Sequence, residues 1–150
     1  MADRHVCPTF SWQKRCLPHL AMLKTGILNP EINSLLARVR HTNLLVIADR
    51  GFPFWPQIET VDISLVDDVQ TVLEVLAAVR LNFVIDQVWM AEEFLRHNDE
   101  ATRTRFDNGL AGLNVDREPH VALKQRVPQA IGLIRTGDTL QYANMILRSG

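Results

Sequence analysis

The sequence predicts an α/β fold, a single-domain sheet with helices on its faces. Short apolar runs alternate along the chain with segments of helical periodicity, which is the pattern of such a fold. The length of 150 residues is that of one domain, and 47% hydrophobic and 22% charged residues are ordinary for a globular protein. Ligands of such sheets bind at the carboxyl ends of the strands, so polar residues there are the first candidates for a site.

The first predicted elements are a helix and a buried strand. Asn29 can serve as an N-cap, Pro30 suits the first helical position, and apolar residues at helical spacing extend this helix to about Arg40. The run Leu-Leu-Val-Ile-Ala at 44–48 is short and wholly apolar, which is typical of a strand buried on both faces. It ends at Asp49, before a loop rich in proline and aromatic residues.

A second strand and a second helix follow that loop. Residues 61–66 alternate in polarity, as expected of a strand. Asp67 or Asp68 is expected to cap the next helix, whose apolar face begins at Val69 and includes Val79. Although Asp67 and Asp68 could also be imagined in a metal-binding cluster with Asp62, we interpret them as a helix start.

The second half of the chain is less evenly patterned. A strand is expected over 83–90, and a helix over 91–98 with two glutamates in its first turn, where they favour the helix dipole. Residues 99–117 are polar and are expected to be part helix and part loop. A short helix is expected near His120. The last elements are strands over 131–134 and 145–147, with a turn at 136–138 between them.

The charge balance excludes several classes of partner. Sixteen Lys and Arg residues balance seventeen Asp and Glu residues, for a formal net charge of -1. We therefore expect no nucleic-acid partner and no electrostatic attachment to a membrane. No apolar run approaches the ~18 residues of a membrane span, and two cysteines do not make a disulfide framework. These features favour a cytoplasmic protein.

The N-terminal segment is expected to differ from the rest of the chain. We expect residues 1–21 to form a flexible extension before a domain over 22–150. A transit peptide, or a translation start at Met22, would also account for the segment. It contains the side chains of a zinc site, but their spacing does not match known zinc modules, so no metal is expected. These side chains are His5, Cys7, Cys16 and His19.

Candidate catalytic residues stand at the ends of predicted strands. The sequence has no glycine-rich nucleotide motif, no nucleophile elbow and no zinc-protease motif. It does place His41, Asp49, His120, Tyr142 and Asn144 at strand ends. Each has a structural explanation as well. His41 could favour a helix dipole, Asp49 could end a strand, and His120 could be a solvated helix residue. Tyr142 and Asn144 could satisfy backbone groups in a turn.

Several short motifs in order resemble one protein family. They are Met-Leu-Lys-Thr-Gly-Ile-Leu-Asn-Pro-Glu at 22–31, His-Thr at 41–42, Val-Ile-Ala-Asp-Arg-Gly at 46–51, Ile-Arg-Thr-Gly at 134–137 and Tyr-Ala-Asn at 142–144. Together they are similar to the D-ribose pyranase and L-fucose mutarotase family, in that family's order and spacing. Ala143 favours the ribose branch.

The resemblance implies a cofactor-independent mutarotase that interconverts the pyranose, furanose and anomeric forms of a free monosaccharide, D-ribose or L-fucose. It implies that His41 is the proton donor and that the protein forms ring-shaped homo-oligomers, commonly decamers. The residues that it assigns to sugar binding are Asp49, His120, Tyr142, Ala143 and Asn144. The chemistry suits these residue types, because a histidine can donate and recover a proton near neutral pH without a metal or a nucleotide.

The positions of His41 and Asp49 predict where the site is built. The two residues stand before and after the strand at 44–48, so an extended chain would place them some 20 Å apart at ~3.3 Å per residue. A monosaccharide is far smaller than that. The sequence therefore predicts either that His41 of one subunit and Asp49 of a neighbour share one sugar, which we prefer, or that the chain curls sharply before Leu44.

Two other functions stay open at this point. A non-catalytic sugar-binding or regulatory protein could keep the fold and lose turnover, because Arg50 and the bulky pair Phe54 and Trp55 could reshape the pocket. Alternatively, Arg50 could bind the phosphate of a phosphorylated sugar. Phe54 and Trp55 could stack on a sugar or on a neighbouring subunit. Away from this loop, His97 is expected to be a helix cap or a surface residue, and the aromatic residues Trp89 and Phe94 are expected in the core or in subunit contacts.

Overall fold

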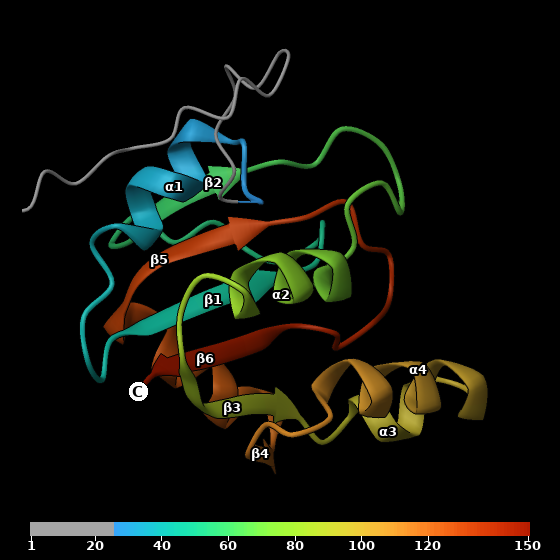
Figure 1. Ribbon diagram of the computed structural model, residues 1–150. Coiled ribbons are helices and arrows are strands. Elements are labelled where there is room, and N and C mark those ends of the chain that lie inside the picture. Colours follow the sequence, from blue (N-terminus) through green and yellow to red (C-terminus); the bar gives the residue numbers. More distant parts are fainter. Residues whose placement is uncertain (1–25) are drawn as a thin grey trace, which may run out of the picture.

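A computed structural model of the protein describes residues 26–150, which form one six-stranded sheet with helices on both faces (Figure 1). The predicted α/β fold class is thus confirmed. The strand order is β2-β5-β1-β6-β3-β4. The strands are β1 (Leu44–Ala48), β2 (Glu59–Asp62), β3 (Ile85–Ala91), β4 (Val115–Glu118), β5 (Ala130–Arg135) and β6 (Met145–Ser149). The four His and Cys residues considered as zinc ligands lie outside the described residues.

Strand directions bring many loops to one edge of the sheet. β6 is antiparallel to both of its neighbours, β1 and β3, whereas the pairs β2–β5, β5–β1 and β3–β4 are parallel. The other strands therefore all run in one direction, and their carboxyl ends share an edge with the amino end of β6. We call this edge the carboxyl edge of the sheet.

The helices divide the core into two layers. They are α1 (Pro30–Leu36), α2 (Val72–Arg80), α3 (Phe94–His97), α4 (Glu100–Leu110) and α5 (His120–Arg126), with a 3-10 turn at Val127–Gln129. Leu45 and Ile47 of β1 belong to one buried cluster, with residues of α1, α2, α3 and α4, and Val46 and Ala48 belong to the other, with Leu123 of α5. This period-two alternation confirms that β1 is buried on both faces.

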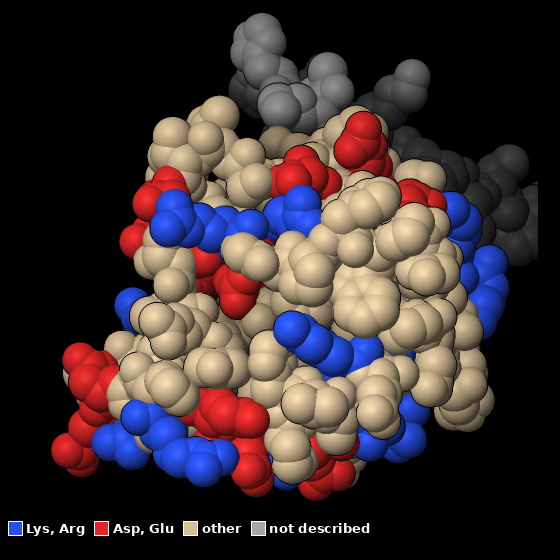
Figure 2. All heavy atoms as spheres, turned by 180° about the vertical axis from the view of Figure 1, so that it is seen from behind, with Lys and Arg blue, Asp and Glu red and all other residues tan. Residues whose placement is uncertain are grey.

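The face opposite α2 carries α5 and mixed charge. Figure 2 shows Lys and Arg side chains interspersed with Asp and Glu on this face, with uncharged residues between them. On this side of the sheet Trp89 is 8% exposed, with the guanidinium groups of Arg126 and Arg148 4.4 and 5.5 Å from its ring centroid. Trp89 and Phe94 are both buried, in agreement with the expectation of core positions. None of the helices within residues 26–150 has the length and apolar character that a membrane span requires.

Helix α1 is shorter than predicted. Its N-cap is Asn29, as expected, and the Asn29 side chain accepts hydrogen bonds from two helical N–H groups. The helix ends at Leu36, not near Arg40. Arg40 instead enters a turn with Asn43, since the Arg40 N–H donates to Asn43 Oδ1 at 2.8 Å and the Asn43 N–H donates to the Arg40 carbonyl at 2.9 Å. This turn redirects the chain into β1.

The prediction for β2 was wrong in its bounds. The strand covers Glu59–Asp62, not 61–66. It stops because the Asp62 carboxylate accepts the N–H of Ser64 at 3.0 Å, an Asx turn that bends the chain away from the sheet.

The prediction for the start of α2 was also wrong. The N-cap is Thr71, whose capping box with Glu74 is complete. Asp67 pairs with Arg50, and Asp68 accepts hydrogen bonds from the backbone N–H and hydroxyl of Thr139.

Three elements in the second half also differ from the sequence-based expectation. β4 was missed because it is an edge strand with a charged sequence, Val-Asp-Arg-Glu. The helix expected over 91–98 is reduced to α3, because strand pairing continues past β3: the Glu92 N–H donates to the Glu118 carbonyl at 2.9 Å. The region 99–117 contains the full helix α4. The strands expected over 83–90, 131–134 and 145–147 are confirmed, with small shifts of their ends.

Candidate active site

A pocket of about 280 Å³ lies at the carboxyl edge of the sheet. Asp49 follows β1, His120 begins α5 directly after β4, and Tyr142 and Asn144 precede β6. The shared edge explains why residues so distant in sequence meet. The pocket is lined by Asp49, Gly51, Phe52, Pro53, His120, Lys124, Gln141, Tyr142 and Asn144. A larger groove of about 640 Å³ involves α1 and α2, and the candidate residues from the sequence do not line it.

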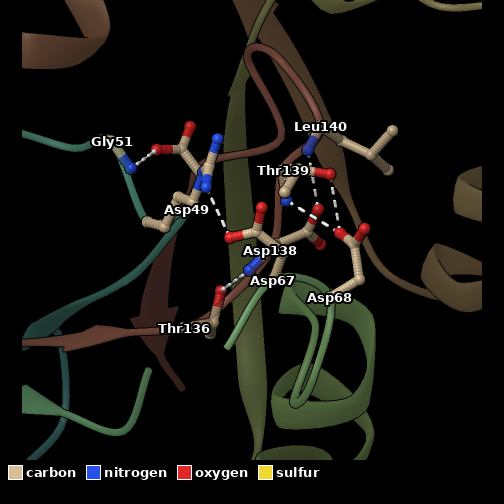
Figure 3. Close-up of polar contacts among 9 residues, drawn as sticks. Asp49, Gly51, Asp67, Asp68, Thr136, Asp138, Thr139 and Leu140 are labelled. Atoms are coloured by element: carbon tan, nitrogen blue, oxygen red, sulfur yellow. Dashed lines mark hydrogen bonds and ion pairs between the residues drawn. The ribbon is translucent and has the colours of Figure 1, made fainter. Parts of the chain in front are cut away.

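Asp49 and Asn144 hold each other at the floor of this site. The Asp49 N–H donates to Asn144 Oδ1, and Asn144 Nδ2 donates to Asp49 Oδ2, both at 2.8 Å. The Gly51 N–H donates to Asp49 Oδ1 at 2.9 Å (Figure 3). Each carboxylate oxygen accepts one of the two hydrogen bonds from Asn144 and Gly51, and a carboxylate oxygen has the capacity to accept a further one from a ligand hydroxyl.

Burial raises the pKa of Asp49 above its ordinary value. The hydrogen bonds from Asn144 and Gly51 oppose this change, and the negative charge of Asp138 adds to it. Asp49 is therefore a desolvated carboxylate with fixed orientation.

His120 is anchored through its backbone and has a free ring nitrogen. Its N–H donates to both carboxylate oxygens of Glu93, at 3.1 and 3.0 Å, which caps α5 where Pro119 offers no side-chain acceptor. His120 Nε2 is buried and has no hydrogen-bond partner within residues 26–150. A buried polar atom of this kind is normally satisfied, so Nε2 is suited to a ligand hydroxyl.

Burial also lowers the pKa of His120. The positive charge of Lys124 acts in the same direction, and Glu93 and Asp49 oppose it. The imidazole therefore stays neutral to lower pH than an ordinary histidine, and Nε2 can accept a proton.

Tyr142 completes the wall of the pocket. Its φ is 59°, in the left-handed region that non-glycine residues rarely adopt. Its ring centroid lies 5.0 Å from that of His120 at an interplanar angle of 87°. The exposed ring of His97 contacts Tyr142 as well, with 4.8 Å between centroids.

The loop that follows β5 supports the site from behind. The Thr136 hydroxyl donates to the Ala48 carbonyl at 2.9 Å, and the Asp138 N–H donates to the Thr136 hydroxyl at 3.2 Å. The Asp138 carboxylate is 1% exposed and accepts the N–H of Val72 at 2.9 Å. It also accepts the N–H of Leu140 at 2.9 Å (Figure 3). These bonds fix the chain that leads to Tyr142.

Some of the predicted residues do not line the pocket. The Ala143 side chain is fully buried in the core cluster shared with α1, α2 and α4. Arg50 pairs with Asp67 at the surface. Phe54 is 69% exposed, and neither it nor Trp55 lines the pocket.

His41 lies at the opposite edge of the sheet. It is exposed just before β1, where the Thr42 N–H donates to the carbonyl of Ser149, the last residue of β6, at 2.9 Å. The turn before Leu44 does include a left-handed residue, Thr42, with φ 68°. It nevertheless leaves His41 at the amino end of β1, about 15 Å of strand away from Asp49. The structure therefore brings together four of the candidate residues and leaves His41 apart from them.

Sequence reasoning missed several residues of the site. Glu93, which anchors His120, was interpreted as part of a helix start. Lys124 stands four residues after His120, so a helical spacing rule would have placed both on one face of α5. Phe52 and Pro53 could have been found from their position directly after Asp49. Among residues 26–150, no group of three or more His, Cys, Asp and Glu side chains is arranged to hold a metal ion.

Comparisons with known proteins identify the family of this chain. Residues 22–150 match the RbsD / FucU transport protein family. A D-ribose pyranase of Geobacillus kaustophilus is 42% identical over 132 residues, covering 86% of this chain and 94% of the relative. A D-ribose pyranase of Chromobacterium violaceum is 38% identical over 129 residues, covering 86% of this chain and 98% of the relative. The chain belongs to the RbsD/FucU family, which confirms the resemblance seen in the sequence. The prediction of an isomerase is confirmed by these relatives.

Solved structures show the same fold. The structure of Bacillus subtilis RbsD complexed with D-ribose superposes with a TM-score of 0.79 at 29% identity, covering 86% of this chain and 98% of that one. The fucose mutarotase of Streptococcus pneumoniae, in complex with L-fucose, gives a TM-score of 0.64 at 18% identity, covering 88% and 98%. At that identity the second comparison establishes the fold alone.

Proposed function

We propose that this protein is a D-ribose pyranase, a cofactor-independent isomerase that interconverts the pyranose, furanose and anomeric forms of free D-ribose. The observation that carries the proposal is the polar pocket at the carboxyl edge, which is lined by the Asp49–Asn144 pair and by His120, whose buried Nε2 has no hydrogen-bond partner within residues 26–150. The relatives named D-ribose pyranase and the ribose complex of the Bacillus subtilis protein favour ribose as the sugar.

The pocket suits a small polyhydroxylated ligand. Its volume of about 280 Å³ falls just below the ~300–1,000 Å³ of pockets that hold drug-sized molecules. Its polar groups differ in kind: the Asp49 carboxylate accepts hydrogen bonds, Asn144 and Tyr142 can donate and accept, and Lys124 donates. A pentose, which presents hydroxyl groups around a compact ring, can use all of them.

The proposed reaction is acid–base opening of a cyclic hemiacetal. A proton reaches the ring oxygen, the bond between that oxygen and the anomeric carbon breaks, and the anomeric hydroxyl loses its proton as the free aldehyde forms. The aldehyde then closes through a different hydroxyl or on its other face. We assign His41 as the acid and the neutral Nε2 of His120 as the base, while Asp49 and Asn144 orient the sugar. Acid–base catalysis of this kind contributes ~10²–10⁴-fold.

We further propose that His41 reaches the sugar from a neighbouring subunit. His41 is exposed at one edge of the sheet while the pocket lies at the other, so one chain does not supply both to one small ligand. A head-to-tail ring, as in the decamer implied by the family resemblance, would join the two edges of adjacent copies.

Complementation between variants tests the shared site directly. His41→Ala and Asp49→Asn homo-oligomers should each be inactive. Co-expressed in equal amounts, they should recover about a quarter of the wild-type activity, because random mixing gives that share of sites two intact partners. No recovery in mixed oligomers, or a stable monomer in gel filtration with full activity, would contradict the shared site.

One observation favours a second candidate, a sugar-binding protein without turnover. The proposed acid does not line the pocket, so the pocket of a single chain can bind a sugar without opening its ring. Arg50 does not line it either, so the structure does not favour a phosphorylated sugar.

Saturation-transfer NMR between the pyranose and furanose signals of D-ribose separates the candidates. Exchange accelerated by the wild type and lost in His41→Ala supports the pyranase. Calorimetric binding of ribose without acceleration supports the binding protein. Faster exchange of L-fucose than of D-ribose would correct the substrate, and inhibition by ribose 5-phosphate would restore the phosphorylated sugar.

A further inference from the structure

A second histidine contacts the site from outside the pocket. His97 is the last residue of α3, and its ring packs on that of Tyr142 with 4.8 Å between centroids and an interplanar angle of 42°. Tyr142 lines the pocket and His97 does not. Through this contact, His97 can influence a bound ligand only by way of the tyrosine ring.

Asn98, the residue that follows His97, uses its side chain to hold the backbone of the segment that contains Tyr142. Asn98 Nδ2 donates to the Gln141 carbonyl at 2.9 Å and to the Phe94 carbonyl at 3.0 Å. This contact matters because Tyr142 has φ 59°, a conformation that a non-glycine residue keeps only where its surroundings hold it in place. Two successive residues at the end of α3 therefore fix both the ring and the preceding peptide of Tyr142.

We propose that His97 and Asn98 are positioning residues that set the ring of Tyr142 against the pocket and thereby determine the affinity for the sugar. The identity of the sugar as D-ribose rests on the proposed function, whereas the positioning of Tyr142 does not. A side chain that is already fixed loses less conformational freedom when a ligand binds. Loss of the contacts that fix the Tyr142 ring should therefore weaken the affinity for the sugar more than it lowers the exchange rate at saturating sugar.

The contact is one of ring packing, which makes a conservative replacement informative. Phenylalanine keeps a flat ring at position 97, and alanine removes it. Arg96 provides a matched control, because it precedes His97 on the same short helix, is exposed and pairs with Glu92 at 2.9 Å. Arg96→Ala therefore changes α3 without removing the ring contact to Tyr142.

The chain has a single tyrosine, which gives a direct probe of this positioning. Protein labelled with 3-fluorotyrosine should show one ¹⁹F resonance, from Tyr142. In His97→Ala the resonance should shift or broaden, while in His97→Phe and Arg96→Ala it should stay close to that of the wild type. An unchanged resonance in His97→Ala would overturn the proposal, whether or not the protein acts on ribose.

Binding and rate measurements then test the consequence for the sugar. For His97→Ala and Asn98→Ala we expect the Kd for D-ribose to rise about five- to tenfold, with little change in the exchange rate at saturating ribose. His97→Phe, which keeps a ring at position 97, should have a Kd close to that of the wild type. In a Tyr142→Ala background, His97→Ala should have no further effect on Kd. Equal losses in both backgrounds, with thermal melts showing folded protein, would overturn action through Tyr142. A wild type that neither binds nor converts ribose would instead contradict the proposed function, and the ¹⁹F comparison would still decide the positioning.

Discussion

Asn144 and Asp49 form a two-point hydrogen-bonded pair, with both bonds at 2.8 Å, although they are 95 residues apart in sequence. One bond is to the Asp49 backbone and the other to its carboxylate. The pair thus joins the end of β1 to the start of β6 and orients the carboxylate in the pocket. Asn144 is 4% exposed, so water does not replace these bonds easily when the amide is lost.

We predict that Asn144→Ala reduces both stability and sugar binding. The substitution leaves the Asp49 N–H without its acceptor and one carboxylate oxygen without its donor, and an unsatisfied buried group costs about 1–3 kcal/mol. Urea denaturation should show this loss in the free energy of unfolding. Asn108→Ala, at an exposed position of α4, should change it little. Equal stability of the two variants would show that the pair contributes no stability.

We predict opposite changes at His120 from two neighbours of opposite charge. Glu93 raises the pKa of His120 and Lys124 lowers it. Glu93→Gln keeps an acceptor for the His120 N–H and removes the charge, so the pKa should fall further. Lys124→Gln should raise it. Titration of the His120 ring signals by NMR checks both, and a change of the same sign in the two variants would contradict the electrostatic argument.

The activity should follow the same titration. Because the proposed base, His120, would act in its neutral form, the acid limb of the rate profile should lie below the pH expected for an ordinary histidine. In Lys124→Gln this limb should move to higher pH along with the measured pKa of His120. An acid limb that does not move while the pKa does would remove His120 from the role of base.

Much of the carboxyl edge could be predicted from the sequence because local patterns determine it. A short apolar run marks β1, so the position of Asp49 at a strand end follows from the sequence itself. The pairing of Asp49 with Asn144 does not follow, because it depends on β6 lying antiparallel beside β1. That neighbour relation is set by the packing of the whole sheet.

Other parts of the site lack any local signal. β4 is polar because it is an edge strand, so its sequence resembles a loop, and the bounds of the strand that precedes His120 were not predicted. The cap of α5 comes from Glu93, which belongs to another segment of the chain. By contrast, strand length predicted the separation of His41 from Asp49 as the preferred of two alternatives, the other being a sharp curl before Leu44, because five residues of extended chain have a nearly fixed length.

We predict that Gly137→Ala disrupts the loop behind the pocket. A Cβ atom at Gly137 would lie 2.4 Å from the Val66 carbonyl oxygen and 2.7 Å from that of Val69. Backbone atoms at such distances must shift, at a cost of about 1–3 kcal/mol. Differential scanning calorimetry should show a lower Tm. Gly51→Ala is the control, because its Cβ would meet only Asp49 Oδ1, at an ordinary 3.5 Å. A Tm for Gly137→Ala equal to that of the control would contradict the close approach of the two loops.

The raised pKa of Asp49 predicts a specific dependence of stability on pH. The folded chain binds this proton more tightly than the unfolded chain, whose carboxyl titrates near 3.8. The stability that Asp49 contributes is therefore fully present below that value and is lost as pH rises through the folded pKa. The free energy of unfolding of the wild type, relative to Asp49→Asn, should therefore fall as the pH rises above 3.8 and through the raised pKa of the folded chain.

Asp99 supplies a control of opposite sign for this pH dependence. Hydrogen bonds from Thr102 at the start of α4 lower the pKa of Asp99, so its contribution is present above 3.8 and is lost as pH falls. The free energy of unfolding of the wild type, measured relative to Asp99→Asn, should therefore rise with pH. Measured relative to Asp49→Asn, it should fall with pH. Parallel curves for the two comparisons would show that burial does not dominate the ionisation of Asp49. The Asp49 carboxylate, which we propose orients the sugar, would then be as well solvated as a surface residue, and its hydrogen bonds to a ligand would compete with water.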